Sequence, residues 1–464
     1  MDWVFFYVKR VFLFDISIDV TLQKKRFSDR INAIENEAGG CYDSGNNGQI
    51  FRGSKRKSGG MSAFDGVVYQ LLYEYFKYNG ETDGRRHVIT GDIPAMWLRD
   101  SAAQLRPYLF LAKEDEEIRE LIAGLVRRQF QYICTDEYAN AFNDSDSGAC
   151  WEKDDPDQNP WVWERKFEID SLCYPIQLAY LLWKNTGCTS QFNDLFISGA
   201  EKILQVFTTE QYHEEKSAYR FVRNNGFFRD TLSREGKGAL TKSGIGLIWS
   251  GFRPSDDACT YGYLIPANMF AVVALGYLKE IAEEIYQNQD LADRAAALQA
   301  EVHEAIEQFG KTFTEEFGTV YAYETDGYGM FNLMDDANVP SLLSMSYLGY
   351  PADKETAVNT RKLLFSDANP YFFKGKAAQG IGSPHTPSGY VWHIAMAMEG
   401  LTTDDREEKR RILENMEATT AGKNMMHEGF CCEDDTRYTR EWFSWANAMY
   451  SELFLDYLGY HLKK

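Results

Sequence analysis

Apolar side chains recur at helical spacing along most of this chain, and that pattern constrains the fold more than any other feature. The i, i+3, i+4, i+7 spacing of an amphipathic helix is clear around residues 64–75, 118–126, 172–181, 269–277, 291–306 and 442–453. About a dozen such segments follow residue 60, whereas only 219–222 and 319–323 resemble short hairpin strands. We therefore predict an all-α fold in which two layers of helices form a closed ring.

The first part of the chain differs from the rest. Residues 39–61 are rich in Gly, Ser and Lys, which predicts a flexible linker. We therefore expect residues 1–60 to be an N-terminal extension and linker without an assigned function, and residues 61–464 to form one domain. With 44% hydrophobic residues, a segment of that length can bury a large core.

Composition argues against several classes of partner. The 69 acidic residues outnumber the 49 basic ones, and a net charge of −20 repels phosphate backbones, so we expect no nucleic-acid partner. We expect no membrane helix either, because no apolar run reaches about 18 residues. The eight cysteines form no Cys-x-x-Cys pair, which favours reduced thiols over disulfides or a zinc site. The first 14 residues contain Asp2, Lys9 and Arg10 and lack the pattern of a secretory signal, so we expect a cytoplasmic location.

The segment TGDIPAMWLRDS, residues 90–101, concentrates charge next to an expected helix start at Ser101. Carboxylates such as Asp92 and Asp100 and a guanidinium such as Arg99 bind hydroxyl groups, and the Trp97 indole can stack on a sugar ring. A polyhydroxylated ligand would suit this set. The alternative is an Arg99–Asp100 ion pair that only holds a loop.

A second segment, SGFRPSDDACTYGYLIP at residues 250–266, places Asp256 and Asp257 among aromatic and turn residues before a helix. Partial burial and the neighbouring carboxylate should raise the pKa of one Asp, as a general acid requires. Alternatively, one of the two caps the following segment. The pair Asp335–Asp336 is more typical of a helix cap.

Glu428 follows His427 and precedes the final helix, and together with Asp256 it gives the two carboxylates that glycosidic hydrolysis requires. Glu441 competes for this role, although an acidic residue in a first helical turn is the more ordinary interpretation. His385 can hydrogen-bond a sugar hydroxyl, whereas His393 is more typical of a packing residue.

These segments resemble glycoside hydrolase family 125, the exo-acting α-1,6-mannosidases. The resemblance is carried, in order along the chain, by TGDIPAMWLRDS (90–101), YANAFN (138–143), SGFRPSDDACTYGYLIPANMF (250–270), MDDANVPSL (334–342), GSPHTPSGYVWH (382–393) and 426–447. It implies an (α/α)6 barrel, no cofactor or metal, and inverting removal of terminal mannose from N-glycan or yeast-mannan fragments. It also implies that the acid is one of Asp256 and Asp257, of which we take Asp256, and that Glu428 is the base. The implied substrate-binding residues are Asp92, Trp97, Arg99, Asp100, Arg253, Asp257 and His385.

Two positions depart from the family pattern. Gly429 stands where we expect Ser, which could loosen the loop that aims Glu428, and Glu441 stands where we expect Pro.

Three alternatives stay open at this point. Another (α/α)6 glycosidase of the glucosidase or trehalase type would use the same two carboxylates. A Mg²⁺-dependent prenyl-diphosphate enzyme needs an Asp-Asp-x-x-Asp motif, which none of the five Asp-Asp pairs provides. A sugar-binding scaffold without activity would not need two well-placed acids.

Overall fold

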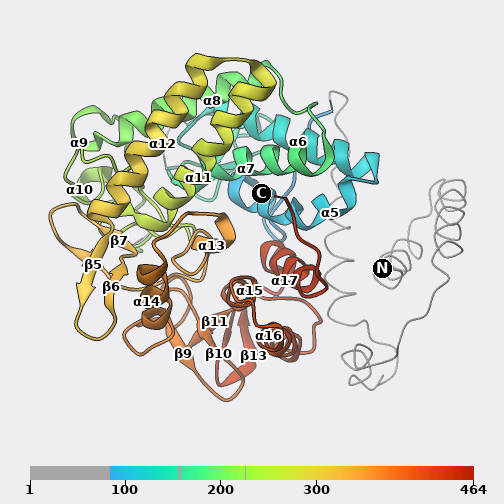
Figure 1. Cartoon of the computed structure of the whole chain (residues 1–464), viewed down its shortest axis with the longest axis vertical. Coiled ribbons are helices and arrows are strands. Elements are labelled where there is room, and N and C mark those ends of the chain that lie inside the picture. Colours follow the sequence, from blue (N-terminus) through green and yellow to red (C-terminus); the bar gives the residue numbers. More distant parts are fainter. Residues whose placement is uncertain (1–83, 155–157, 225, 464) are drawn as a thin grey trace, which may run out of the picture.

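The computed structural model describes residues 84–154, 158–224 and 226–463 of the chain. In this part, helices form two layers and short strands lie in the connections (Figure 1). The helix expected at 64–75 and the boundary expected after residue 60 lie outside the described residues. The other five helices named from their periodicity are confirmed, as α6, α7, α11, α12 and α17.

The inner layer consists of helices that are buried along most of their length. Its members are α4 (Leu98–Leu105), α7 (Ile169–Thr186), α11 (Ile265–Ile281), α13 (Met345–Leu348), α15 (His393–Leu401) and α17 (Ser444–Tyr457). Helix α4 packs on α7, α7 on α11, α11 on α13 and α15 on α17, and α17 packs back on α4. The first and last inner helices are therefore neighbours, as a closed ring requires.

The outer layer consists of amphipathic helices with polar N-terminal caps. Its members are α6 (Glu116–Thr135), α8 (Asp194–Glu210), α12 (Gln289–Phe309), α14 (Lys354–Leu364) and α16 (Arg406–Ala418). Each begins after an Asp or Asn whose side chain accepts hydrogen bonds from the first turn: Asp115, Asn193, Asn288, Asp353 and Asp405. Helix α6 packs on α7, α12 on α11, and α16 on α15 and α17, so their apolar stripes cover the inner layer.

The inner helices begin differently. None of the six, in the part of the chain that the structure describes, has a side-chain cap at its N-terminus. Loop carbonyls accept the first N–H groups instead: Leu98 N donates to Asn140 O at 3.0 Å and Ile265 N to Tyr323 O at 2.9 Å. The loops around these N-terminal ends are thereby fixed in place.

Five small antiparallel sheets lie in the described connections. Their strands are β1 (Met96–Trp97), β2 (Ala141–Phe142), β3 (Val162–Glu164), β4 (Tyr263–Leu264), β5 (Lys311–Thr314), β6 (Gly318–Tyr321), β7 (Glu324–Thr325), β8 (Phe331–Asn332), β9 (Phe372–Lys374), β10 (Gln379–Ile381), β11 (Tyr390–Trp392), β12 (Gly429–Cys431) and β13 (Asp434–Thr439). Strands β1, β4 and β11 run directly into α4, α11 and α15. The sheets therefore hold the segments that lead into the inner helices.

The strand predictions had mixed success. The hairpin of β5 and β6 confirms the strand expected at 319–323. The strand expected at 219–222 is wrong, because this segment forms no ladder, although Phe221 N donates to Gly236 O at 3.1 Å. Its side chains still alternate between buried and exposed, which is the pattern that suggested a strand. The remaining short helical elements are α5 (Leu109–Ala112), α9 (His213–Lys216), α10 (Ser233–Gly236), a 3₁₀ turn η1 (Arg106–Tyr108) and a π-helical turn η2 (Ala282–Tyr286).

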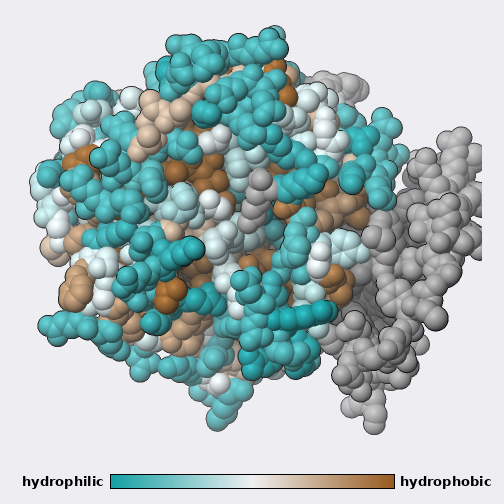
Figure 2. All heavy atoms as spheres, viewed as in Figure 1, coloured by the Kyte–Doolittle hydropathy of each residue, from teal (hydrophilic) through white to brown (hydrophobic). Residues whose placement is uncertain are grey.

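One hydrophobic cluster extends from Val88 to Phe454 and joins both layers. Among the described residues, Ile265–Tyr286 alone is long and apolar enough to cross a membrane, but 78% of its most apolar window is buried in the protein, as in a core helix. The face shown in Figure 2 is largely hydrophilic, with hydrophobic residues in small groups. The seven cysteines in the described part are free thiols.

Candidate active site

Charged residues gather where the chain enters the inner helices. Arg99 lies in the first turn of α4, and Glu168 is the residue directly before α7. Asp256 lies in the loop that leads to β4 and α11, His385 in the loop that leads to β11 and α15, and Glu428 directly before β12. These segments, far apart in sequence, supply one group of interacting side chains.

Arg99 is the centre of this group. Its guanidinium is 2% exposed and contacts four carboxyl groups. The contacts are Nη1–Glu168 Oε2 at 2.5 Å, Nη1–Asp170 Oδ2 at 3.4 Å, Nη2–Asp256 Oδ1 at 3.2 Å and Nε–Asp100 Oδ2 at 3.3 Å. The Arg99–Asp100 ion pair that we considered as a purely structural alternative is therefore present, but as one part of a larger buried network. Helix α4 begins at Leu98, three residues before the expected start.

Of the four carboxyl groups that contact Arg99, that of Asp256 is the one that faces outward. Its side chain is 28% exposed, whereas those of Glu168 and Asp170 are fully buried. Its backbone has φ of 64°, a left-handed conformation that is uncommon outside glycine and often marks a functional residue. The Lys166 ammonium donates to its carbonyl oxygen at 2.9 Å, and this bond fixes the turn.

The expected pKa shift of Asp256 is wrong in direction. Burial alone would raise its pKa, but the cations of Arg99 and Lys166 and a hydrogen bond with Glu168 lower it to about 2. The raised pKa is found at Glu168, where burial and the negative charge of Asp256 favour the protonated form. Burial also raises the pKa of Asp170, to about 6. In this pair, the surroundings therefore favour an ionised Asp256 and a protonated Glu168.

Asp257 and His385 form the next contact in the site. Asp257 is 5% exposed, and its Oδ1 lies 2.9 Å from His385 Nδ1. Burial opposes the charged imidazole, but the hydrogen bond to Asp257 and the charges of Asp257, Glu428 and Asp256 raise the pKa of His385 to about 9. A cationic His385 therefore lies within the field of both candidate catalytic carboxylates.

This pKa predicts how stability changes with pH. Because the pKa rises from 6.5 to about 9 on folding, protonated His385 stabilises the protein fully below pH 6.5, and this contribution is lost as the pH approaches 9. We expect the difference in unfolding free energy between wild type and His385→Gln to shrink over this range in urea titrations. The side chain is 39% exposed, so solvent screening reduces the effect.

His461→Gln is the matched control, since His461 also contacts an aspartate, Asp456, at 2.9 Å but is 67% exposed. Its difference from wild type should vary less with pH than that of His385→Gln. A difference for His385→Gln that grows toward pH 9 would contradict the prediction.

Glu428 is 7% exposed, and its charge acts on His385. Arg440 Nη1 is 3.7 Å from Glu428 Oε1, and Arg440 Nε donates to Asp92 Oδ1 at 3.1 Å. Arg440 therefore joins the predicted base to the predicted sugar-binding Asp92. The backbone approaches closely here, because a Cβ on Gly91 would lie 2.9 Å from the Trp442 carbonyl oxygen, and Gly91 has φ of +110°.

The two departures from the family pattern are accommodated. Gly429 was expected to loosen the segment that aims Glu428, but it lies in β12, paired with Trp392 and Thr439, so that expectation is wrong. A Cβ at Gly429 would lie 3.0 Å from Trp392 Nε1, which explains why glycine fits. Glu441 precedes α17 rather than lying in its first turn, and it is exposed and paired with Lys423 at 2.9 Å.

Other predicted residues have internal partners. Arg253 Nε donates to Glu324 Oε1 at 2.7 Å and is buried. Trp97 is 4% exposed and packs with Ala141 and Trp163, so its stacking on a sugar stays a prediction. His393 is confirmed as a packing residue, fully buried and 3.1 Å from Thr419 Oγ1.

The Asp335–Asp336 pair behaves as a structural element. Asp335 accepts from Leu342 N at 2.9 Å and Leu343 N at 3.0 Å, as a capping carboxylate does. Asp336 accepts from Ser255 Oγ at 2.8 Å and so supports the loop that carries Asp256.

Four charged residues of the site were missed from sequence: Lys166, Glu168, Asp170 and Arg440. The first three belong to the segment KFEID, which runs into the first turn of α7 and in sequence resembles an ordinary acidic helix start. Arg440 adjoins Glu441, and from sequence only the carboxylate of that segment is considered, as a competing base.

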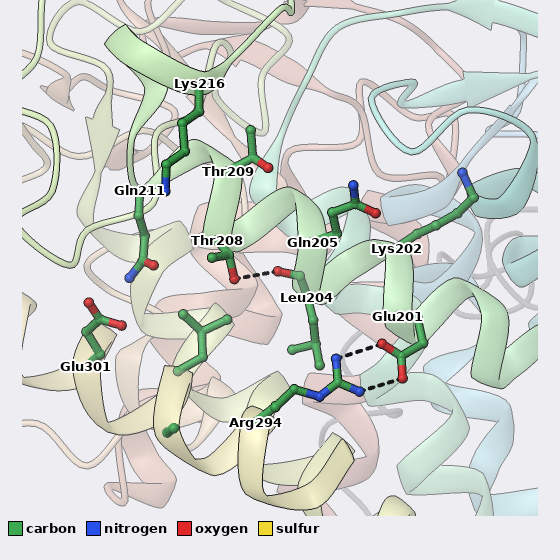
Figure 3. Close-up of a pocket in the computed structure, with 12 residues that line it drawn as sticks. Glu201, Lys202, Leu204, Gln205, Thr208, Thr209, Gln211, Lys216, Arg294 and Glu301 are labelled. Atoms are coloured by element: carbon green, nitrogen blue, oxygen red, sulfur yellow. Dashed lines mark hydrogen bonds and ion pairs between the residues drawn. The ribbon is translucent and has the colours of Figure 1, made fainter. Parts of the chain in front are cut away.

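The structure also has a hollow away from these residues. A cavity of ≈ 630 Å³ lies between the outer helices α8 and α12, lined by residues that include Gln205, Thr208 and Glu301 (Figure 3). The Arg294–Glu201 ion pair, with Arg294 Nη2 2.6 Å from Glu201 Oε1, lies at its edge. None of the candidate site residues lines it.

Comparison with known proteins gives a consistent result. A family described as metal-independent α-mannosidase (GH125) matches residues 66–455. The meiotically up-regulated gene 157 protein of Schizosaccharomyces pombe is 40% identical over 390 residues, which cover 80% of this chain and 76% of that protein.

Solved structures agree with this. A metal-independent α-mannosidase of Streptococcus pneumoniae, in a non-productive complex with α-1,6-mannobiose, is 47% identical with a TM-score of 0.83, over 86% of this chain and 95% of that one. A glucoamylase from Saccharomycopsis fibuligera has a TM-score of 0.56 at 11% identity, over 86% of this chain and 94% of its own. The second likeness shows the fold alone, and it confirms the predicted (α/α)6 barrel.

Proposed function

The chain belongs to glycoside hydrolase family 125, the metal-independent α-mannosidases, and from this membership we propose that it removes single mannose residues from the non-reducing ends of α-1,6-linked oligosaccharides with inversion. The observation that supports the mechanism is that one cationic residue, His385, interacts electrostatically with both the outward-facing Asp256 and Glu428. The solved relative in complex with α-1,6-mannobiose supports the linkage.

In the proposed reaction, Asp256 donates a proton to the glycosidic oxygen as the bond from C1 to that oxygen breaks. Glu428 accepts a proton from a water molecule whose oxygen bonds to C1 from the opposite face. Arg440 Nη1 lies 3.7 Å from Glu428 Oε1, beside the carboxylate that would take this proton. Inversion requires room for this water, with the two carboxyls about 6.5–9.5 Å apart.

The other polar residues would hold the terminal sugar. Asp92 and His385 have exposed side-chain surface and can bind mannose hydroxyls, while Asp257 orients His385. Arg99 and Asp100 are buried and paired with each other, and Arg99 also holds Asp256, so they would act by fixing the acid in place. N-glycan or yeast-mannan fragments, as sources of terminal α-1,6-linked mannose, are the substrates that we propose, and residues 61–464 are the proposed catalytic domain.

The earlier alternatives lose support. The prenyl-diphosphate hypothesis is wrong, because the chain belongs to a glycoside hydrolase family. The likeness to glucoamylases is confined to the fold at 11–14% identity and does not favour a glucoside substrate.

The decisive experiment is hydrolysis of α-1,6-mannobiose in EDTA, with the anomer of the first product observed by NMR. We expect release of β-mannose, since inversion of an α-linkage yields the β-anomer. Isomaltose, the corresponding α-1,6-linked glucose disaccharide, is the matched control and should not be cleaved. Release of α-mannose would contradict inversion, and cleavage of isomaltose alone would contradict the mannose specificity.

A further inference from the structure

Glu168 is a buried acid that the proposed reaction does not yet use. Its Oε2 accepts hydrogen bonds from Arg99 Nη1 at 2.5 Å and from Ser171 Oγ at 2.8 Å. Its other oxygen, Oε1, receives no hydrogen bond from any group in the described part of the chain. An ionised carboxylate with one oxygen buried and unpaired is costly, so this environment favours a protonated Glu168.

The proton has an acceptor nearby. Arg99 holds the carboxyl groups of Glu168 and Asp256 next to each other, with Nη1 2.5 Å from Glu168 Oε2 and Nη2 3.2 Å from Asp256 Oδ1. Two neighbouring carboxyls can share a hydrogen bond only if one carries a proton. The charges around Arg99 also favour one protonated carboxyl, because this single guanidinium contacts four carboxyl groups that are mostly buried. Full ionisation of all four would leave excess negative charge in the core.

The two acids differ in access to solvent. Glu168 is fully buried and cannot reach a substrate, whereas 28% of the Asp256 side chain is exposed. We propose that Glu168 is the positioning residue that holds the proton that Asp256 delivers to the leaving oxygen. This inference rests on the proposed function, and it explains how an Asp beside Arg99 and Lys166 can still act as an acid.

Glu168 first gives its proton to a carboxylate oxygen of Asp256, and this oxygen then turns toward the substrate. Asp256 gives the same proton to the glycosidic oxygen as the C1–O bond breaks. Glu168 is left as a carboxylate, stabilised by Arg99 and Ser171. Glu428 takes one proton from the attacking water and later releases it to solvent, and the acid pair regains one proton from solvent through Asp256.

Several charged groups act on this pair and set its titration. The charged or acidic ones are Arg99 and Asp100 on α4, Asp170 on α7, Lys166 before α7 and His385 on a facing loop; Cys259, on the other facing loop, is a neutral thiol whose pKa burial raises. The positive charges of Arg99 and Lys166 lower the pKa of Asp256. Without Glu168, Asp256 would therefore carry a proton only at low pH.

The test is Glu168→Gln with two substrates. A glutamine amide can still donate to Asp256 but carries no transferable proton. We expect kcat on α-1,6-mannobiose, whose leaving group needs protonation, to fall about 10²-fold, within the range for lost acid catalysis. With dinitrophenyl α-mannoside, whose leaving group needs no proton, kcat should stay within a few-fold of wild type. The alkaline limb of the kcat/KM profile on mannobiose should move to lower pH.

Asp256→Asn should show the same contrast between the two substrates and serves as the reference. Glu452→Gln is the matched control, because Glu452 is also a buried Glu paired with a buried arginine, Arg106, at 2.8 Å, but it lies outside the site. Any effect of Glu452→Gln should be equal on both substrates, with an unmoved pH profile.

Equal losses on both substrates for Glu168→Gln, with an unmoved alkaline limb, would overturn the inference and leave the proposed function intact. Failure of the wild type to cleave either mannoside would instead overturn the function itself. If Glu168→Gln does not fold, Ser171→Ala decides. Loss of the Ser171 hydroxyl destabilises ionised Glu168, so the alkaline limb should move to higher pH, and an unmoved limb would overturn the inference.

Discussion

Glu428→Gln is expected to lower kcat on α-1,6-mannobiose by about 10³-fold, within the range for a lost general base. Glutamine keeps the size of the side chain but cannot accept the proton of the attacking water. Glu428 contacts Arg440 at 3.7 Å and makes no shorter ion pair in the described part of the chain, so its loss should leave the fold intact. Initial rates and thermal unfolding of wild type and variant, measured together, check both points.

Glu441→Gln is the matched control for this loss. Glu441 lies in the same C-terminal segment and competes for the role of base, but it is exposed and bound to Lys423 and Tyr438. We expect its activity to remain near that of wild type. A loss of activity in Glu441→Gln, with full activity in Glu428→Gln, would mean that the base was assigned to the wrong carboxylate.

The fold was largely predictable because helical periodicity is a local property. In α6, α7, α11, α12 and α17, the apolar residues at helical spacing indicate which face is buried, regardless of what that face contacts. The same argument failed at Tyr219–Val222, where alternation of burial is present but no partner strand forms a ladder. Periodicity predicts the buried face of a segment; pairing depends on tertiary context that a short pattern does not contain.

The site was predictable only where chemistry is concentrated in short segments. Asp256, Asp257 and His385 stand out among turn residues. In the structure, His385 contacts Asp257 and interacts electrostatically with Asp256. Glu168 and Asp170 do not stand out, because an acidic residue at a helix start is ordinary. Their role depends on Arg99, about 70 residues earlier in the chain, and on burial, neither of which is visible in the segment itself.

The direction of the Asp256 pKa shift shows the same limit. From sequence, burial and the adjacent Asp257 argue for a raised pKa. In the structure, Asp257 turns toward His385, and Arg99 and Lys166 stabilise the Asp256 carboxylate. The carboxyl group that matters is that of Glu168, whose hydrogen bond lowers the pKa of Asp256, and no local pattern connects these two residues.

The second large effect concerns stability, and it follows from the same buried network. We expect Arg99→Met to lower the free energy of unfolding by about 3–5 kcal/mol near neutral pH, the usual cost of leaving a buried charge without its partner. Methionine fills similar space, so the loss comes from Glu168, Asp170, Asp100 and Asp256 rather than from a cavity. Urea unfolding followed by tryptophan fluorescence measures it.

Arg294→Met is the control for this variant. Arg294 also binds a carboxylate through two nitrogens, to Glu201 at 2.6 Å and 2.8 Å, but it is 44% exposed. Exposed ion pairs are screened by water, so its loss should cost no more than about 1 kcal/mol. A loss in Arg99→Met no larger than that in Arg294→Met would contradict a dominant role for burial.

The dependence on pH separates lost pairing from general damage to the core. Without Arg99, burial raises the carboxyl pKa values above their unfolded values of about 4, so these groups destabilise the folded protein wherever the unfolded chain is ionised. As the pH falls from about 8 to about 5, the buried carboxyls of the variant take up protons and the penalty declines. The gap between wild type and Arg99→Met should therefore narrow toward acid pH. A constant gap would point to lost packing, and a gap that widens on acidification would contradict the assignment of excess negative charge to this network.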